Sequence, residues 1–481
     1  MMKMSKSLSL LFVITMLFYS CDNWIEGYDD DPNSSPEVSI DNLFTASQVN
    51  IFNFSENHLA RTVAIWMQQM AGMDRQYKSL GLYLIEENDY AAAWQSVYIN
   101  GGLKDLRKIQ LKADEKGIKG ARYKGIAQIM EAYLIGMAAS IWGDIPYSEV
   151  FNKSIDNPKL DDQADIYLSV QTLLDTAIQN LKSDTTLIPQ NDMFFNGDIK
   201  KWKAVAHTLK ARYYMHWVEA DISNCDSALY HSKLGRSLLD GLNGLDGTMK
   251  TLHGIESSEQ NMWYQFAQDR QDYMVAGSNI IQLLKNNNDP RDSIYFGEND
   301  AGSIVGASLN PDEEEGTETK GKSYLNDEYF GADASIDIIS YEENLLIQAE
   351  CHFLKDEISE AQQALEDAQT AAEKKWGFEE DTFSGISLTG SSLLNKIIEE
   401  KYIALFLNIE LWNDYKRNCY PDVKYKKSTD DDGNPIYAYP PARVYYPEDE
   451  RITNNNIPDI SSQSKYNDND KEQCGIIPAG W

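Results

Sequence analysis

The feature that most constrains this chain is an apolar stripe that recurs at helical spacing. In residues 122–141 apolar side chains return at positions i, i+3, i+4 and i+7, and the same pattern fills 164–181 and 199–220. Such a stripe buries one face of a helix against other helices. Gly143 is placed to end the first helix, and Asp198 is placed to cap the third. The body of the protein is therefore predicted to be mainly helical.

Other segments repeat the pattern more briefly. They lie at about 41–71, 88–110, 225–240, 274–285, 340–354, 357–375 and 392–417. Short linkers join many of these helices, which favours antiparallel pairs that stack on their neighbours, as in tetratricopeptide superhelices. Residues 243–272, 286–339 and 419–481 lack the pattern and are rich in Asn, Asp and turn-forming residues. We predict irregular structure there, and long irregular segments of this kind often carry function.

The N-terminus has the layout of an export signal. Lys3 and Lys6 precede a mostly apolar stretch at 8–20, which is shorter than the roughly 20 residues that a membrane-spanning helix needs. Cys21 follows directly, as in a bacterial lipobox, although Phe18 stands where lipoboxes favour Leu, Val or Ile. The alternative is a soluble exported protein whose cysteine lies there by chance.

We therefore predict that residues 1–20 are a lipoprotein signal peptide and that Cys21 is the lipidated residue. Residues 21–40 are acidic and rich in Pro, Ser and Asn, which indicates an extended tether. No later segment holds 18 consecutive apolar residues. The chain is predicted to be anchored to a membrane without crossing it.

The charge of the chain excludes one class of partner. Asp and Glu number 75 against 43 Lys and Arg, which gives a net charge of −32. A protein this acidic repels nucleic-acid phosphates, so we expect no DNA or RNA ligand. The aromatic residues favour another kind of ligand, because 28 Tyr and 10 Trp outnumber 15 Phe. Aromatic rings with a polar group suit surfaces that bind a half-polar molecule.

Motifs for catalysis, metals and cofactors are missing or out of context. Residues 316–323 fit the G-x-x-x-x-G-K-S pattern of phosphate-binding loops, but an acidic run at 312–315 stands where a strand is required, so we predict a surface loop. The six His show no metal-ligand spacing, and the acidic run 430–432 fails the EF-hand pattern. The sequence gives no positive evidence for an enzyme, a metal or a cofactor, and calcium binding is unsupported.

Six segments, in order, resemble the motifs of the SusD/RagB family of outer-membrane lipoproteins. The first, at 139–150, contains the string WGDIPYSE, and the second, at 197–212, contains GDIKKW followed by LKAR. The others lie at 288–291, 343–350, 400–417 and 443–456. Each segment alone is a weak signal, but six in family order are specific.

The resemblance implies a fold and a role. The expected fold is mainly α, a right-handed superhelix of four tetratricopeptide-like helix pairs with an irregular, loop-rich ligand-binding part. Residues 41–481 would form a single SusD-like domain. Its helical scaffold would span about 41–240 and 340–418, its loop-rich part about 241–339, and its irregular C-terminal segment 419–481. Trp142, Trp202 and Trp412, which belong to the motifs, are predicted to be core residues.

The implied role is non-catalytic. The protein would be a lipid-anchored outer-membrane protein at the surface of a Gram-negative cell. It would capture oligosaccharides and act as the lid of a TonB-dependent, SusC-like transporter. Two alternatives stay open at this point. One is a lid for peptides or another non-glycan oligomer, and the other is a secreted glycosidase.

Candidate glycan-binding residues can be chosen by composition alone. Sugar rings offer flat C–H faces and a rim of hydroxyls, so their sites need exposed Trp or Tyr rings beside polar side chains. Three segments outside the predicted helices have this mixture. Their candidate residues are Tyr77 and Tyr83, then Trp263, Tyr264, Arg270 and Tyr273, and finally Tyr324 and Tyr329. The competing interpretation for each aromatic is packing beneath its own loop.

Overall fold

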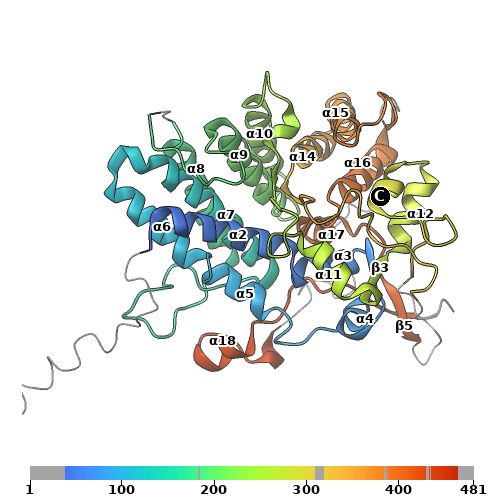
Figure 1. Ribbon diagram of the computed structural model, residues 1–481, viewed down its shortest axis with the longest axis horizontal. Coiled ribbons are helices and arrows are strands. Elements are labelled where there is room, and N and C mark those ends of the chain that lie inside the picture. The colour runs from blue at the N-terminus through green and yellow to red at the C-terminus, as the bar shows by residue number, and fades with distance from the viewer. Residues whose placement is uncertain are drawn as a thin grey trace, which may run out of the picture.

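Many of the helices predicted from the apolar stripes form one continuous row (Figure 1). Each helix packs against the next in the order α6 (Leu103–Glu115), α7 (Ala121–Trp142), α8 (Gln163–Asn180), α9 (Ile199–Met215), α10 (Asn224–Ser237), α14 (Tyr341–Leu354) and α15 (Ile358–Trp376). This computed structural model describes residues 38–182, 185–308, 319–383, 387–429, 433 and 435–463.

Other helices lie beside the row. They are α2 (Ile40–Glu56), α3 (His58–Trp66), α4 (Arg75–Gly81), α5 (Ala91–Tyr98), α16 (Gly390–Ala404), α17 (Glu410–Asn418) and α18 (Glu448–Thr453). The helices predicted at 41–71, 88–110 and 392–417 are thus each divided in two. The first break lies at Asn57, whose side chain accepts a hydrogen bond from the backbone N–H of His58 at 2.7 Å and so caps α3.

The row is continuous in space but not in sequence. α10 and α14 pack together although about a hundred residues separate them, and the intervening chain lies to one side of the row (Figure 1). This insert contains α11 (Met262–Asp269), α12 (Ser278–Asn286) and α13 (Arg291–Tyr295). The prediction of irregular structure at 243–272 and 286–339 was therefore wrong at α11 and α13. Both are at most about two turns long, too short for a periodic stripe to be detected.

In the described parts of the chain, three two-stranded antiparallel ladders complete the fold. They are β1 (Met70–Gly72) with β3 (Met274–Ala276), β2 (Met249–Lys250) with β4 (Asp337–Ile339), and β5 (Tyr425–Thr429) with β6 (Pro435–Ala438). The third ladder and α18 lie in the segment 419–481, so the prediction that this segment is irregular was wrong for these residues. In the first ladder Met70 pairs with Ala276 and Gly72 with Met274, which ties the insert to the N-terminal helices.

Two predicted helix ends are confirmed. Gly143 ends α7 with a positive φ of 90°, a conformation that glycine adopts without strain. Asp198 begins α9, and its Oδ1 accepts hydrogen bonds from the backbone N–H groups of Lys200 at 2.8 Å and Lys201 at 3.2 Å. These bonds satisfy two of the N–H groups that a helix start leaves without partners.

We expect Asp198→Ala to lower the free energy of unfolding by about 1 kcal/mol, because the substitution removes the cap of α9. Urea unfolding followed by circular dichroism measures this change. Lys200→Ala is the matched control, since Lys200 is exposed in the same turn. A variant as stable as the wild type would show that the cap contributes nothing.

The three motif tryptophans are core residues, as predicted. Trp142 is 2% exposed, and Trp202 and Trp412 are fully buried. Their indole N–H groups also hold other segments in place. Trp142 donates to the carbonyl oxygen of Tyr445 at 3.1 Å, and Trp412 donates to that of Pro441 at 2.7 Å. The C-terminal segment is therefore fixed to the helical row through two motif residues.

The charged residues of the motifs pair with one another in the interior. Arg212 of α9 donates to Glu343 of α14 at 2.5 and 2.6 Å. Glu350 of α14 accepts from Arg417 of α17 at 2.6 Å. A third set joins the insert to α16, with Arg291 bound to Asp289 and Glu400 at distances down to 2.5 Å. All of these side chains are at most 6% exposed.

Two further properties bear on function. Among the described residues, the segment Gly117–Trp142 is the only one that is long and apolar enough to cross a membrane, and its apolar window is completely buried in the protein. A buried core helix passes the same test, so this is weak evidence for a membrane span. Within the described ranges, no three His, Cys, Asp or Glu side chains form a group that could hold a metal ion.

Candidate functional site

The β1–β3 ladder brings two of the predicted ligand-binding segments together. α4 follows β1, and α11 with the short turn Gln271–Tyr273 precedes β3. The backbone N–H of Met73 donates to the carbonyl oxygen of Tyr273 at 2.9 Å. Residues 72–87 and 260–273, about 190 positions apart in the sequence, therefore form one surface.

An aromatic cluster lies at this junction. The ring centroid of Tyr77 is 5.0 Å from that of Phe266 and 6.2 Å from that of Tyr273, and Phe266 and Tyr273 are 6.1 Å apart. The hydroxyl of Tyr77 accepts a hydrogen bond from Arg61 Nε at 3.0 Å. We call Tyr77, Phe266 and Tyr273, with Arg75 and Arg270 at its edge, the Tyr273 cluster.

Tyr273 is the outer member of this cluster. Its ring is half-buried, whereas Tyr77 beneath it is only 2% exposed. The guanidinium carbons of Arg75 and Arg270 lie 5.8 and 5.9 Å from the centre of the Tyr273 ring, and both arginines are exposed. Cationic groups at this distance are attracted by an aromatic ring. The arrangement offers an aromatic surface flanked by hydrogen-bond donors.

Acceptors lie in the same segments. The side chains of Asp74, Asp269 and Asp272 are exposed in the segments that flank α4 and α11. Asp272 also accepts a hydrogen bond from Thr319 Oγ1 at 2.8 Å. A ligand with a flat apolar face and many hydroxyls would find both kinds of partner here, which is the chemistry of a sugar ring.

Three of the predicted binding residues cannot present a ring to a ligand in this structure. Trp263 is 1% exposed, and Tyr77 and Tyr83 are each 2% exposed. The large apolar area of each ring is removed from water by packing beneath its own segment. The hydroxyl of Tyr83 also donates to the carbonyl oxygen of Val423. For these three residues the packing interpretation replaces the ligand-binding prediction.

The remaining candidates divide into two locations. Tyr264 and Tyr324 are half-buried, and Tyr324 packs on the small apolar cluster of Ala71, Met73, Val275 and Ala307 beside the β1–β3 ladder. Tyr329 is 37% exposed, and its ring meets Trp376 at the end of α15, 6.1 Å between centroids. Tyr324 is thus adjacent to the Tyr273 cluster, whereas Tyr329 belongs to a different contact.

Two members of the site were missed from the sequence. Phe266 lies three residues after Trp263 on α11, so this helix carries an aromatic pair at helical spacing. The guanidinium of Arg61 lies 4.5 Å from the centre of the Phe266 ring while it also binds the Tyr77 hydroxyl. The spacing of Trp263 and Phe266 could have indicated a short helix, but nothing local to Arg61 indicates its partners.

Other predictions fall partly or wholly outside the described residues. Cys21, the signal peptide and the acidic run 430–432 lie outside them. Of the phosphate-loop pattern at 316–323, only residues 319–323 are described, and they form a turn. The described chain from 319 to 340 has no helix after the pattern, so the helix N-terminus that binds phosphate in such loops is lacking.

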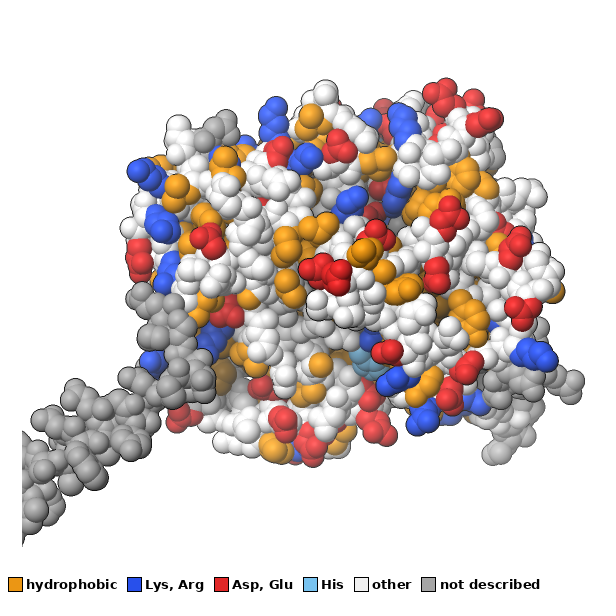
Figure 2. Space-filling view, viewed as in Figure 1, with side chains coloured by type: hydrophobic (Ala, Val, Ile, Leu, Met, Phe, Trp, Pro, Cys, Tyr) orange, Lys and Arg blue, Asp and Glu red, His pale blue; other side chains and the backbone are white. Residues whose placement is uncertain are grey.

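The face that carries α4 and α11 is mixed in charge. Figure 2 shows acidic and basic side chains interspersed over it, with hydrophobic side chains in small groups between them. Such a surface has no strong field of one sign.

The structure is a row of paired helices that carries an insert with an aromatic and polar surface. The comparison with protein families makes this specific. Residues 32–447 match the SusD-like family described as "starch-binding associating with outer membrane". The match covers most of the chain, so the protein belongs to the SusD-like family.

Solved structures agree with this assignment. A SusD/RagB family protein from Bacteroides thetaiotaomicron is 20% identical, with 88% of this chain and 95% of that chain covered at a TM-score of 0.66. A chitin-binding SusD homologue from Flavobacterium johnsoniae is 17% identical, with coverage of 89% and 98% and a TM-score of 0.69. A SusD homologue from Bacteroides fragilis is 16% identical, with coverage of 91% and 99% and a TM-score of 0.66. At these identities the likeness establishes the fold.

The comparison with curated proteins gave no significant match. The family and the structures together confirm the expected fold class, a tetratricopeptide-like helical fold. They also confirm the expected outer-membrane localisation and lack of catalysis, since the family consists of non-catalytic binding proteins associated with the outer membrane. The protein is an outer-membrane nutrient-binding protein. The glycosidase alternative is therefore set aside.

Proposed function

We propose that this protein captures a neutral oligosaccharide on the Tyr273 cluster and delivers it to a SusC-like, TonB-dependent transporter, for which it acts as the lid. The observation that carries the proposal is the partly exposed ring of Tyr273 between Arg75 and Arg270. The ring can stack on the C–H face of a sugar while the guanidinium groups donate to its hydroxyls.

Charge supports a neutral cargo. The chain has a net charge of −32, and the exposed Asp74, Asp269 and Asp272 offset Arg75 and Arg270, so the cluster has no excess of positive charge that would select a polyanionic glycan. A chitin-binding relative with the same fold is consistent with a neutral sugar. In this proposal Cys21 carries the lipid that holds the protein at the outer membrane, and residues 21–40 are the tether that lets it reach the transporter.

The first test is Tyr273→Ala. We expect affinity for the cognate oligosaccharide to fall by about 1–3 kcal/mol, a loss typical of a central aromatic contact. Isothermal titration calorimetry with chitin and malto-oligosaccharides measures it, and thermal unfolding checks that the variant is folded. Tyr230→Ala is the matched control, because Tyr230 is a 61% exposed tyrosine on α10, outside the cluster. If wild type and Tyr273→Ala bind the oligosaccharide with equal affinity, the Tyr273 cluster is not the binding surface.

A further inference from the structure

Two neighbouring cavities lie in the helical row, on elements that do not contribute to the Tyr273 cluster. The first, which we call the polar cavity, has a volume of about 220 Å³, and its lining includes the cations Lys416, Arg417 and Arg443 and one carboxylate, Glu219. The second, the apolar cavity, has a volume of about 230 Å³. It is lined mainly by Tyr, Trp, Leu and Ala side chains of α8, of the end of α9 and of the segment after it, with Gln171, Asp221 and Asn224 as its polar members. Tyr167, Trp217 and Ala220 line both.

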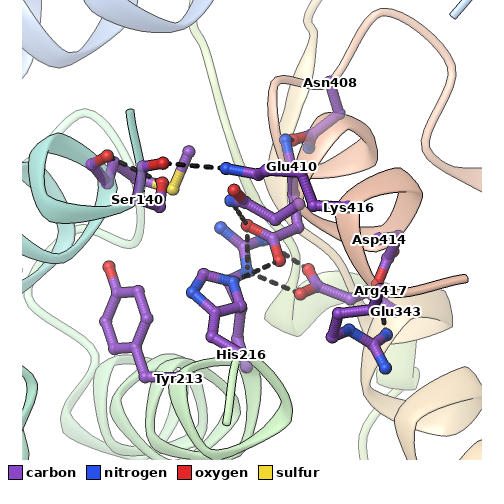
Figure 3. Close-up of polar contacts among 12 residues, drawn as sticks. Ser140, Tyr213, His216, Glu343, Asn408, Glu410, Asp414, Lys416 and Arg417 are labelled. Carbon is purple, nitrogen blue, oxygen red and sulfur yellow. Dashed lines mark hydrogen bonds and ion pairs between the residues drawn. The ribbon is translucent and has the colours of Figure 1, made fainter. Parts of the chain in front are cut away.

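The polar cavity contains two cations without a carboxylate partner. Lys416 Nζ donates to the backbone carbonyl oxygen of Ser140 at 2.8 Å, as Figure 3 shows. Among the described residues no ion pair within 4 Å joins Lys416 or Arg443 to a carboxylate, although Glu219 lines the same cavity. The neighbouring cations differ, since His216 contacts Glu410 at 2.7 Å and Arg417 contacts Glu350 at 2.6 Å.

The two unpaired cations influence each other. Burial lowers the pKa of Lys416 to about 7, with Glu410 opposing the shift and Arg443 adding to it. Arg417 provides a further donor, because its Nε has no acceptor among the described residues although the side chain is only 6% exposed. Like charges and an unsatisfied donor around one cavity are unfavourable, and an anion placed among them would relieve both costs.

Contacts with the end of α7 hold Arg443 in position. A Cβ atom on Gly143 would lie 3.0 Å from a terminal nitrogen of Arg443, so the glycine leaves the space that the guanidinium occupies. The backbone N–H of Val444 donates to the carbonyl oxygen of Ile141 at 3.1 Å, which fixes the chain beside Arg443. The arginine is therefore held against the end of α7 at the polar cavity.

The apolar cavity offers a complementary surface next to these charges. Tyr167 is 5% exposed and forms one wall, Trp217 is half-buried, and Leu168 is 67% exposed at the rim. Exposed apolar side chains beside a hollow are typical of sites for an apolar group. A ligand that fits both cavities needs one negative charge and an apolar body.

We propose that these two cavities form a second binding site, which takes a small carboxylate with an aromatic or aliphatic body. The carboxylate accepts hydrogen bonds from Lys416 and Arg443 in the polar cavity. The body lies across Trp217 in the apolar cavity. This site is independent of the oligosaccharide surface, because it is formed by α7, α8, α9, α17 and the segment around Arg443.

The test is calorimetry of the whole mature protein with 3-phenylpropionate as the probe, and with its neutral amide as the matched ligand. We expect saturable binding of the carboxylate and an affinity for the amide that is lower by about tenfold or more, because charge-assisted hydrogen bonds are lost. No saturable binding of the carboxylate at millimolar concentration, or equal binding of acid and amide, would overturn the proposal.

Two variants locate the site. Arg443→Gln should weaken binding of the carboxylate by about tenfold or more through the lost charge. Ala220→Trp places a large side chain at an exposed position that lines both cavities, so it should abolish binding without loss of stability. If Arg443→Gln does not fold, carboxylate binding by Ala220→Trp is sufficient to test the location of the site. If Ala220→Trp binds the carboxylate as well as the wild type does, the proposal is contradicted. As a control, the affinity of Ala220→Trp for oligosaccharide should equal that of the wild type.

Discussion

Glu350→Gln is expected to lower the free energy of unfolding by about 3–5 kcal/mol, the cost of leaving buried charges without their partner. Glu350 is 2% exposed and accepts hydrogen bonds from Arg417 at 2.6 and 3.1 Å and from Lys401 at 3.4 Å. A neutral amide leaves both cations to share Asp414 alone. Urea unfolding at pH 7 measures the loss.

The stabilisation that Glu350 provides depends on pH. Burial opposes ionisation of Glu350, but Arg417 and Lys401 outweigh it and lower its pKa from 4.5 to about 2. Because the folded pKa is the lower one, the stabilisation is complete above pH 4.5 and is lost as the pH falls towards 2. The difference in free energy of unfolding between wild type and Glu350→Gln should therefore decrease as the pH falls from 4.5 to about 2.

The control for Glu350→Gln is a carboxylate of a surface pair. Asp114, whose side chain is 56% exposed, pairs with Lys124 at 2.7 Å. Asp114→Asn should change the free energy of unfolding by less than about 1 kcal/mol, as is usual for exposed ion pairs. The explanation would be contradicted if Asp114→Asn lowered the free energy of unfolding as much as Glu350→Gln does. It would also be contradicted if the stability difference between wild type and Glu350→Gln did not change with pH.

Trp202→Ala should have an effect of similar size, about 3–5 kcal/mol, because it opens a cavity in the core. The fully buried Trp202 ring meets Phe194 and Phe195 edge-to-face at 5.6 and 5.3 Å. Its indole N–H donates to Asp192 Oδ2 at 2.7 Å. The variant therefore loses apolar contacts and removes one donor from a buried carboxylate.

Two comparisons separate these contributions. Trp202→Phe keeps most of the ring but not the N–H, so it should cost about 1–3 kcal/mol. Tyr230→Ala, on the surface of α10, should change stability by no more than about 0.5 kcal/mol. Denaturant midpoints of the three variants provide the measurement. A loss of glycan affinity by Trp202→Phe at unchanged stability would mean that Trp202 acts on the ligand and not in the core.

The helical row could be predicted from local sequence because each long helix carries its own evidence. A stripe of apolar residues, a capping Asp198 and a terminating Gly143 are all properties of nearby positions. The short helix α11 escaped prediction although Asn261 caps it by accepting from the N–H groups of Trp263 and Tyr264. With only eight residues it has too few positions to define a period.

The pairing of distant segments could not be predicted. The motif residues can be recognised in the sequence. The sequence does not indicate, however, that Arg212 pairs with Glu343 or that Glu350 pairs with Arg417. These contacts explain the motifs physically, since each links two helices or an insert to a helix. The charges of the motifs stabilise the fold and are absent from the Tyr273 cluster.

The candidate site was predictable only in part, for the same reason. Composition selected Tyr273 and Arg270 as candidates, and the β1–β3 ladder brings the segment of Arg75 beside them. Composition could not distinguish an exposed ring from a buried one. Trp263 had the most suitable side chain for a sugar platform, yet α11 turns it into the core, where it is 1% exposed.

The most direct test of the central claim is calorimetry of the wild-type protein against matched panels of neutral oligosaccharides and peptides, with the ligands recovered and sized afterwards. The account predicts saturable binding of at least one neutral oligosaccharide, no binding of peptides, and recovered chains of unchanged length. Saturable binding of a peptide with no binding of any oligosaccharide would contradict it, and would favour a lid protein for a different cargo.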